Sequence, residues 1–301
     1  MSDRYLLGID IGTFESKGTL TRIDGQVVSS AAIGHEMSIP KPGWAEHDAQ
    51  DVWWHDFVHL SRQILSESGI DPARIAGAGV SAIAPCVLPV DKCGDPLRPG
   101  ILYGVDTRAS VEIEYFEKEI GRQAIFETCA AHLSSQAAGP KALWIKNNEP
   151  EVWAKTDKIL TGSGYLVYKL TGEHVIDIYT AVGYAPLFDV HKIGWNEDVV
   201  ESFMSMDQLP RLLWSCEVAG RVTHEAAQET DLAVGTPVIA GTADAAAEAL
   251  STGLSQTGDL MLMYGSTIFL IQKTNKLIAT ETMWSAGFVE PETFAVLGGW
   301  G

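Results

Sequence analysis

Short apolar runs alternate along the chain with turns that contain glycine, a rhythm typical of an α/β protein. Residues 5–11 form an apolar run that predicts a buried strand, and the Asp24-Gly25 pair predicts a turn between two further strands. The strands predicted in this way cover residues 5–11, 18–23, 26–32, 75–83, 87–90 and 236–240.

Helical spacing marks three other stretches. Asp48 is a predicted N-cap, because the apolar residues after it recur on one helical face. These face residues are Trp53, Phe57, Leu60 and Ile64. Residues 141–155 predict a second helix, and the alanine-rich residues 243–250 predict a third that ends before Gly253.

The strand–turn–strand pattern of residues 6–24 returns at residues 260–276. Two such units predict two similar domains that face a shared ligand, and the alternative is chance similarity between two ordinary hairpins. A long stretch of chain follows the first unit, whereas the second is soon followed by a glycine-rich end at residues 297–301. We therefore expect a complete domain over residues 1–253 and the start of an incomplete second domain over residues 254–301.

Composition narrows the classes of function. Of 301 residues, 46% are apolar and 20% charged, which is ordinary for a globular protein and excludes disorder as the main state. Lys and Arg number 21 against 39 Asp and Glu, and the resulting charge of −18 argues against a partner that is nucleic acid or an anionic membrane. No apolar run reaches the roughly 18 residues of a membrane span, and the four cysteines lack metal-binding spacing. A reducing cytoplasm is the expected location.

The first turn carries candidate phosphate chemistry. Asp10 ends the first strand, Gly12 and Thr13 form the turn, and Lys17 follows. Such a carboxylate can orient hydrated Mg²⁺, while the N–H groups and hydroxyl of the turn can face phosphate oxygens. Gly265-Ser266-Thr267 occupies the corresponding turn of the second unit. The alternatives are an aspartate that satisfies its own turn and a plain hairpin.

A second candidate is Asp244, at the junction of a predicted strand and a predicted helix. It is either a helix cap or a general base that the helix N-terminus keeps ionised, ready to accept a proton from a substrate hydroxyl. Asp106 and Arg108, with Tyr103 nearby, can grip vicinal hydroxyls or form a local ion pair. Trp44 can add an aromatic edge or simply open the following helix.

Five segments, taken in order, resemble the FGGY family of carbohydrate kinases and its xylulokinase-like members. Together they extend over nearly the whole chain. The segments are residues 8–17, 42–48, 140–150, 165–173 and 235–247. Residues 84–86 read Ala-Pro-Cys where typical xylulokinases have a Met-His pair, which speaks against D-xylulose as the substrate.

The resemblance implies an actin-like, ribonuclease-H-like fold in each domain, and transfer of the ATP γ-phosphoryl group to a sugar or polyol hydroxyl. It makes Asp244 the catalytic base and Asp10 the residue that holds Mg²⁺ through water. The implied phosphate-binding residues are Gly12, Thr13, Lys17, Gly265, Ser266 and Thr267. The implied sugar-binding residues are Trp44, Tyr103, Asp106 and Arg108. The partner is then a small-molecule sugar, and a homodimer is compatible with the sequence. A non-catalytic sugar-binding module and an actin-like ATPase are the alternatives.

Overall fold

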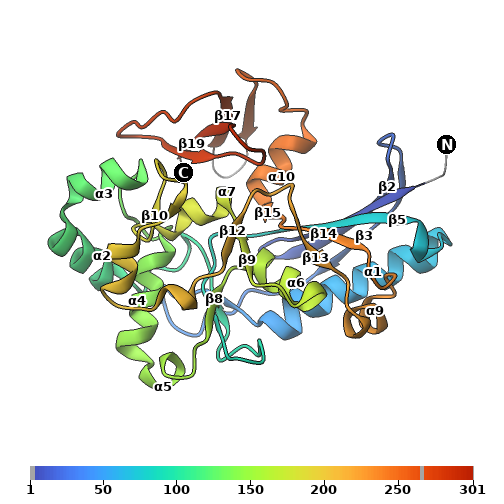
Figure 1. The fold of residues 1–301 in the computed structure, drawn as a ribbon, viewed down its shortest axis with the longest axis horizontal. Coiled ribbons are helices and arrows are strands. Elements are labelled where there is room, and N and C mark those ends of the chain that lie inside the picture. Colours follow the sequence, from blue (N-terminus) through green and yellow to red (C-terminus); the bar gives the residue numbers. More distant parts are fainter. Residues whose placement is uncertain (1–3, 265–267, 301) are drawn as a thin grey trace.

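A seven-stranded mixed sheet organises the N-terminal part of the chain (Figure 1). The computed structural model describes residues 4–264 and 268–300. The strands lie in the order β13 (Val218–Arg221), β14 (Pro237–Ile239), β5 (Ile75–Ala82), β1 (Tyr5–Ile11), β2 (Glu15–Arg22) and β3 (Val27–Gly34). The seventh strand, β15 (Thr242–Ala243), also pairs with β5. The predicted α/β class is confirmed.

The first three strands form an antiparallel meander, as the sequence predicts. The second strand begins at Glu15, three residues before the expected start, because the Gly12 N–H bonds to the Glu15 carbonyl and closes a tight turn. Burial in β1 alternates: Leu7 and Ile9 are buried while Leu6 is 44% exposed. The strand that was expected to be buried is therefore buried on one face only, as is common where strands pair antiparallel.

Three parallel strands end at one edge of this sheet. Strand β5 runs parallel to β1 and to β15, with Asp10 opposite Ser81 and Thr242 opposite the same Ser81. The carboxyl ends of parallel strands are where α/β proteins commonly place ligands. This edge therefore collects residues from three distant segments of the chain.

One face of the sheet is covered by α1 (His55–Ser68), α6 (Gly162–Thr171) and α9 (His224–Thr230), and α9 contacts both of the other helices. Asp48 is the predicted N-cap: its carboxylate accepts from the backbone N–H groups of Gln50 and Asp51. A single π-helical turn, Ala49–Trp54, precedes α1. All four residues of the predicted apolar face are fully buried.

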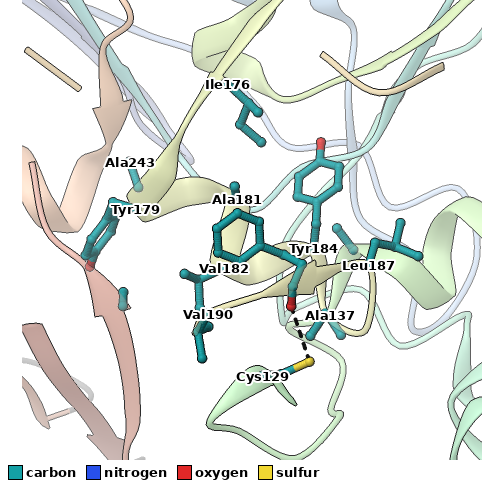
Figure 2. Packing of buried hydrophobic residues seen from close by; sticks show 14 of the residues in the cluster. Cys129, Ala137, Ile176, Tyr179, Ala181, Val182, Tyr184, Leu187, Val190 and Ala243 are labelled. Carbon is teal, nitrogen blue, oxygen red and sulfur yellow. Dashed lines mark hydrogen bonds between the residues drawn. The ribbon is translucent and has the colours of Figure 1, made fainter. Parts of the chain in front are cut away.

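A second layer of helices lies at the end of the molecule opposite the N-terminus (Figure 1). These helices are α2 (Ser110–Phe116), α3 (Arg122–Cys129), α4 (Ala138–Asn148) and α5 (Pro150–Trp153). Helix α7 (Ile178–Ala181) lies nearer the centre of the molecule, and α8 (Glu197–Glu201) follows later in the chain. Four two-stranded sheets lie outside the main sheet in the described part of the chain. They pair β4 (Glu46–His47) with β7 (Gly100–Ile101), β6 (Leu88–Val90) with β8 (Lys158–Leu160), β9 (Val175–Asp177) with β12 (Arg211–Leu213), and β10 (Phe188–Asp189) with β11 (Gly194–Trp195). Figure 2 shows part of the hydrophobic core of this region, in which the Cys129 thiol donates to the Phe188 carbonyl.

The single helix predicted over residues 141–155 is wrong, because two helices occupy that stretch. They meet at Glu149, whose φ of −129° and ψ of 59° are not helical. Pro150 follows, and a proline disfavours helical backbone in the residue before it. Proline at the first position of α5 then starts the new helix without losing a needed N–H.

The C-terminal strands form a separate four-stranded sheet in the order β16 (Leu260–Tyr264), β17 (Ile268–Thr274), β19 (Phe294–Trp300) and β18 (Trp284–Gly287). Helix α10 (Asp244–Ser251) leads into it (Figure 1). The pairing of β16 with β17 is antiparallel, like that of β1 with β2. The boundary at residue 253 stays a prediction. In the described parts of the chain, no helix combines the length and apolarity of a membrane span.

Candidate active site

Two of the predicted carboxylates lie at the same edge of the sheet. Asp10 lies near the end of β1, where the Ser81 hydroxyl donates to its Oδ1 at 2.7 Å. Asp244 follows β15 directly and is the first residue of α10. The two side chains are close enough for the charge of Asp10 to raise the pKa of Asp244. Residues far apart in the sequence thus form one acidic site.

Burial is the main cause of the electrostatic properties of this site. Burial raises the pKa of Asp10, while the Ser81 hydrogen bond and the charge of Lys17 lower it by a smaller amount. Burial also raises the pKa of Asp244 to about 7, and the charges of Asp10 and Glu248 add to the increase. The expectation that the helix N-terminus keeps Asp244 ionised is therefore wrong. One hydrogen bond from the Ala245 N–H does not offset burial beside another carboxylate.

A second aspartate, Asp177, anchors the strand residue that lies two positions before Asp244. The strand residue Thr242 donates its hydroxyl to Asp177 Oδ2 at 2.9 Å, and Ser215 donates to the same oxygen at 2.8 Å. Asp177 is fully buried, and its pKa is raised by that burial. Asp177 was not predicted as a site residue, although it ends a short apolar strand as Asp10 does.

The first predicted phosphate loop is a tight turn at the same edge. A Cβ on Gly12 would lie 2.6 Å from the Glu15 carbonyl oxygen, so this turn requires glycine. The Thr13 hydroxyl is hydrogen-bonded to the Tyr103 hydroxyl at 3.0 Å, which joins the loop to a predicted sugar contact. Lys17 lies opposite Asp10 in the β1–β2 register and pairs with Glu15 at 3.2 Å.

The second predicted loop, Gly265-Ser266-Thr267, lies outside the described residues. Its flanking strands are present, since Tyr264 pairs with Ile268. A role in phosphate binding for these three residues stays a prediction.

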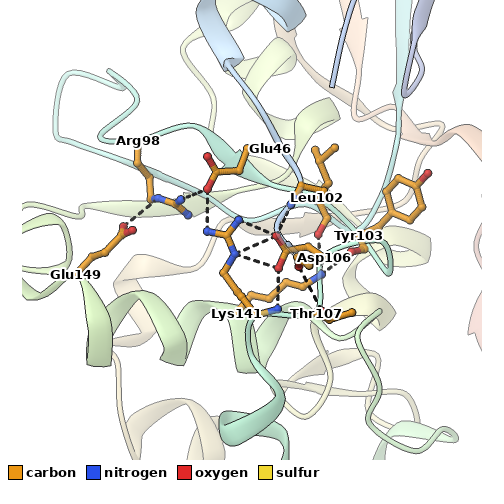
Figure 3. Close-up of polar contacts among 11 residues, drawn as sticks. Glu46, Arg98, Leu102, Tyr103, Asp106, Thr107, Lys141 and Glu149 are labelled. Carbon is orange, nitrogen blue, oxygen red and sulfur yellow. Dashed lines mark hydrogen bonds and ion pairs between the residues drawn. The ribbon is translucent and has the colours of Figure 1, made fainter. Parts of the chain in front are cut away.

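The predicted sugar contacts Asp106 and Arg108 form a buried ion pair (Figure 3). Two guanidinium nitrogens of Arg108 donate to the Asp106 carboxylate at 2.7 to 3.0 Å, and a third lies 2.7 Å from Glu46 Oε1. The Ala45 N–H also donates to Asp106. Asp106 and Arg108 therefore form the local ion pair, which was one of the two alternatives that the sequence allowed. A direct role in sugar binding stays a prediction for both residues.

Aromatic rings and a buried lysine enclose this pair. The Arg108 guanidinium carbon lies 4.0 Å from the centre of the Trp44 ring, so Trp44 contacts the pair rather than standing alone. Lys141 is 1% exposed and donates to the carbonyls of Leu102 and Tyr103 at 2.6 and 2.7 Å. Burial lowers the pKa of Lys141 to about 8. Lys141 was not predicted as a site residue, although it is the one charged residue among the apolar residues 138–145 of α4.

Residues 5–251 match the family model described as "FGGY family of carbohydrate kinases, N-terminal domain". The chain therefore belongs to the FGGY family of carbohydrate kinases, and its fold is the actin-like fold of the N-terminal domain of that family.

Similar proteins include enzymes for different substrates. The "Xylulose kinase" of Lactococcus lactis subsp. lactis (strain IL1403) is 31% identical over 252 residues, which are 83% of this chain and 49% of that enzyme. The "Glycerol kinase" of Thermococcus onnurineus (strain NA1) is 27% identical over 281 residues, 92% of this chain and 55% of that enzyme. The chain spans about half the length of these curated relatives.

Solved structures share the fold over a similar extent. The xylulose kinase from Rhodospirillum rubrum has a TM-score of 0.92 and 28% identity, covering 99% of this chain and 61% of that one. The Plasmodium falciparum glycerol kinase with ADP has a TM-score of 0.88 at 21% identity, covering 99% and 61%. The latter likeness shows the fold alone.

Proposed function

We propose that this chain carries the acceptor side of an ATP-dependent carbohydrate kinase, which transfers the γ-phosphoryl group to a hydroxyl of a sugar or polyol. The observation that carries the proposal is the convergence of Asp10 and Asp244 at the carboxyl edge of three parallel strands. Membership of the FGGY family supports the reaction class, and the ADP-bound glycerol kinase of the same fold supports the nucleotide.

Asp244 is suited to accept the proton of the attacking hydroxyl. A general base works best when its pKa is near the operating pH, and that of Asp244 is about 7. Its carboxylate is fixed by the Ala245 N–H at 2.8 Å and by its place at the start of α10. In phosphoryl transfer the base mainly aligns the hydroxyl, so this fixed position matters as much as the basicity.

The loop at Gly12 and Thr13 is suited to hold phosphate oxygens. It lies directly after Asp10, and Lys17 adds a positive charge on the neighbouring strand. Asp10 fits a role in holding Mg²⁺ through water, because its carboxylate is partly buried and has no cationic partner in direct contact among the described residues. Mg²⁺ commonly takes one or two protein carboxylates and completes its shell with water and phosphate. When bound, the ion neutralises charge on the transferring phosphoryl group.

The sugar side is formed by Tyr103, Trp44 and the Asp106–Arg108 pair. Because the pair is buried, we propose that it fixes the shape of the 103–108 loop, while the more accessible Tyr103 and Trp44 contact the sugar directly. The substrate class is a ketose, polyol or related carbohydrate. A cytoplasmic location is consistent with the use of ATP and with four free thiols.

A coupled ADP-release screen over ketoses, polyols and sugar acids tests the proposal. It should be run on the 301-residue chain and on any longer gene product that contains it, with calorimetry of sugar binding in parallel. Asp244→Asn should lower turnover by about 10²–10⁴-fold while sparing sugar binding. The exposed Asp198, which also lies in a first helical turn, provides the matched control Asp198→Asn. Sugar-independent ATP turnover, or an Asp244→Asn variant with most of its rate, would contradict the assignment.

A further inference from the structure

Two buried histidines lie behind the turn that follows β1. His35 Nε2 lies 3.1 Å from the Gly12 carbonyl oxygen, and His47 Nε2 lies 3.1 Å from the Thr13 carbonyl oxygen. Their rings meet edge to face with centres 5.0 Å apart. The Phe14 carbonyl accepts from the His35 backbone N–H at 2.9 Å. Three successive carbonyls of the turn are thus anchored on the same pair of histidines.

The partners of His35 determine its protonation. Its Nδ1 lies 2.8 Å from Asp56 Oδ2, and a carbonyl oxygen faces its Nε2, so both ring nitrogens face acceptors. Asp56 also accepts from the Ser16 hydroxyl at 2.7 Å and lies 3.1 Å from His55 Nδ1. Burial alone would raise the pKa of Asp56, but these hydrogen bonds outweigh it and the pKa is lowered. These two acceptors favour the doubly protonated ring: burial opposes the charge of His35, but the contacts with Asp56 and with the carbonyls of the turn outweigh it and raise the pKa of His35.

The partners of His47 determine its tautomer instead. The Trp53 indole N–H donates to His47 Nδ1 at 3.1 Å, which leaves Nε2 to carry the proton that reaches the Thr13 carbonyl. His47 is 1% exposed. Burial and the charge of His35 lower the pKa of His47 to about 4, so it stays neutral at physiological pH.

Anchoring these carbonyls sets the direction of the neighbouring amides. Across a planar trans peptide, the C=O of one residue and the N–H of the next point in opposite directions. The Thr13 and Phe14 N–H groups therefore point away from the histidines. Within residues 4–264 and 268–300, neither N–H donates a hydrogen bond, so both are available to an anion.

We propose that His35 and His47 are positioning residues for the phosphate loop: one charged and one neutral imidazole hold successive carbonyls so that the Thr13 and Phe14 N–H groups face the phosphates. The proposal rests on the proposed kinase function. Neither histidine contacts the reacting atoms. Both act through the backbone of the turn, with Asp56 and Trp53 fixing the two rings.

Nitrogen NMR of the histidine side chains tests the protonation states without any enzymatic assay. Long-range ¹H–¹⁵N correlation spectra at pH 7 should show two protonated nitrogens on His35 and only Nε2 protonated on His47. Burial and the charge of His35 lower the pKa of His47 to about 4, so His47 should not titrate down to pH 5. A neutral His35 at pH 7, or a His47 protonated on Nδ1, would overturn the proposal.

Substitutions test the effect on the loop. His47→Gln keeps a donor of similar reach, whereas His47→Leu removes it. The Thr13 and Phe14 amide signals should shift in His47→Leu, and the affinity for inorganic tripolyphosphate should fall about tenfold, as expected for one lost hydrogen bond. His47→Gln should restore most of both properties, and His59→Gln should change neither.

The outcomes separate this proposal from the proposed function. If the wild type does not bind tripolyphosphate, the proposed phosphate role of the loop is wrong. The positioning of the turn by His35 and His47 is then still tested by the amide shifts and by the protonation of the two rings. A folded His47→Leu variant with unchanged Thr13 and Phe14 amide signals would overturn the positioning role of His47. His35→Gln keeps a donor that can reach the Gly12 carbonyl and removes the charge, while Ser16 and His55 still contact Asp56. If the charge of His35 matters, the Thr13 amide signal should shift in His35→Gln, and an unchanged signal would overturn the role of that charge.

Discussion

Asp244→Asn should stabilise the protein at neutral and alkaline pH. The folded-state pKa of Asp244 is about 7 against an ordinary value of 3.8, because burial and the charge of Asp10 disfavour the carboxylate. Between these two values the folded state binds a proton that the unfolded state has lost, so stability falls as pH rises. The amide cannot ionise and retains an oxygen that can accept from the Ala245 N–H.

The size of the effect follows from the shift in pKa. Each unit is worth about 1.4 kcal/mol, so ionising Asp244 in the folded state costs about 4 kcal/mol once the pH is above 7. Between pH 5 and pH 8 the wild type should lose about 2–3 kcal/mol from this group. The stability difference between Asp244→Asn and wild type should grow by the same amount over that range.

Urea unfolding at pH 5, 6, 7 and 8 measures this difference, because contributions from all other groups cancel in the comparison when their pKa values are unchanged. Asp198→Asn removes an exposed first-turn carboxylate and should run parallel to wild type. Asp10→Asn should lower the pKa of Asp244 and reduce the slope, because it removes a repelling charge. If the unfolding free energies of wild type and Asp244→Asn change with pH in parallel, the pKa of Asp244 is not raised in the folded protein.

Three further substitutions probe the surroundings of the site by urea unfolding. Arg108→Met leaves the buried Asp106 carboxylate unpaired and should cost about 3–5 kcal/mol; a loss under 1 kcal/mol would show that water reaches the pair. The pKa of Lys141 is lowered to about 8 in the folded protein, so above pH 8 the folded protein loses this proton while the unfolded chain still binds it. The wild type should therefore be about 1.5 kcal/mol more stable at pH 9.5 than at pH 8, and Lys141→Met should lack this rise. Gly241→Ala should cost at least about 2 kcal/mol, because φ is +73° and the new Cβ would lie 2.3 Å from the Val80 carbonyl; a neutral result would mean that the turn relaxes.

Local patterns predicted the elements on which the site is built. The apolar run over residues 5–11 predicted β1, and the N-cap and helical face predicted α1, because both signals depend on neighbours in the sequence. Asp10 and Asp244 were each predicted as strand-end carboxylates. Their proximity came only from the resemblance and the two-unit pattern, since no local signal says that β15 pairs with β5.

The electrostatics of the site were less predictable. The expectation that Asp244 is ionised relied on the helix N-terminus, the only influence visible in the sequence, and the larger effect of burial depends on tertiary packing. The same limit applies to His35 and His47. Their roles depend on Asp56 and Trp53, which were predicted only as part of a helix and its core.

The negative charge of Asp10 links the proposed phosphate-binding side of the site to the proposed base, Asp244. Asp10 raises the pKa of both Asp244 and Glu248, and Lys17 lowers that of Asp10 and of Glu248. A positive charge entering beside Asp10 therefore lowers the pKa of Asp244 as well, because the same repulsion acts on both carboxylates. Under the proposed function, the cation that accompanies the nucleotide would shift Asp244 toward the carboxylate form. The base would then be fully available only when the phosphoryl donor is bound, which links activation of the acceptor hydroxyl to the presence of the group that it attacks.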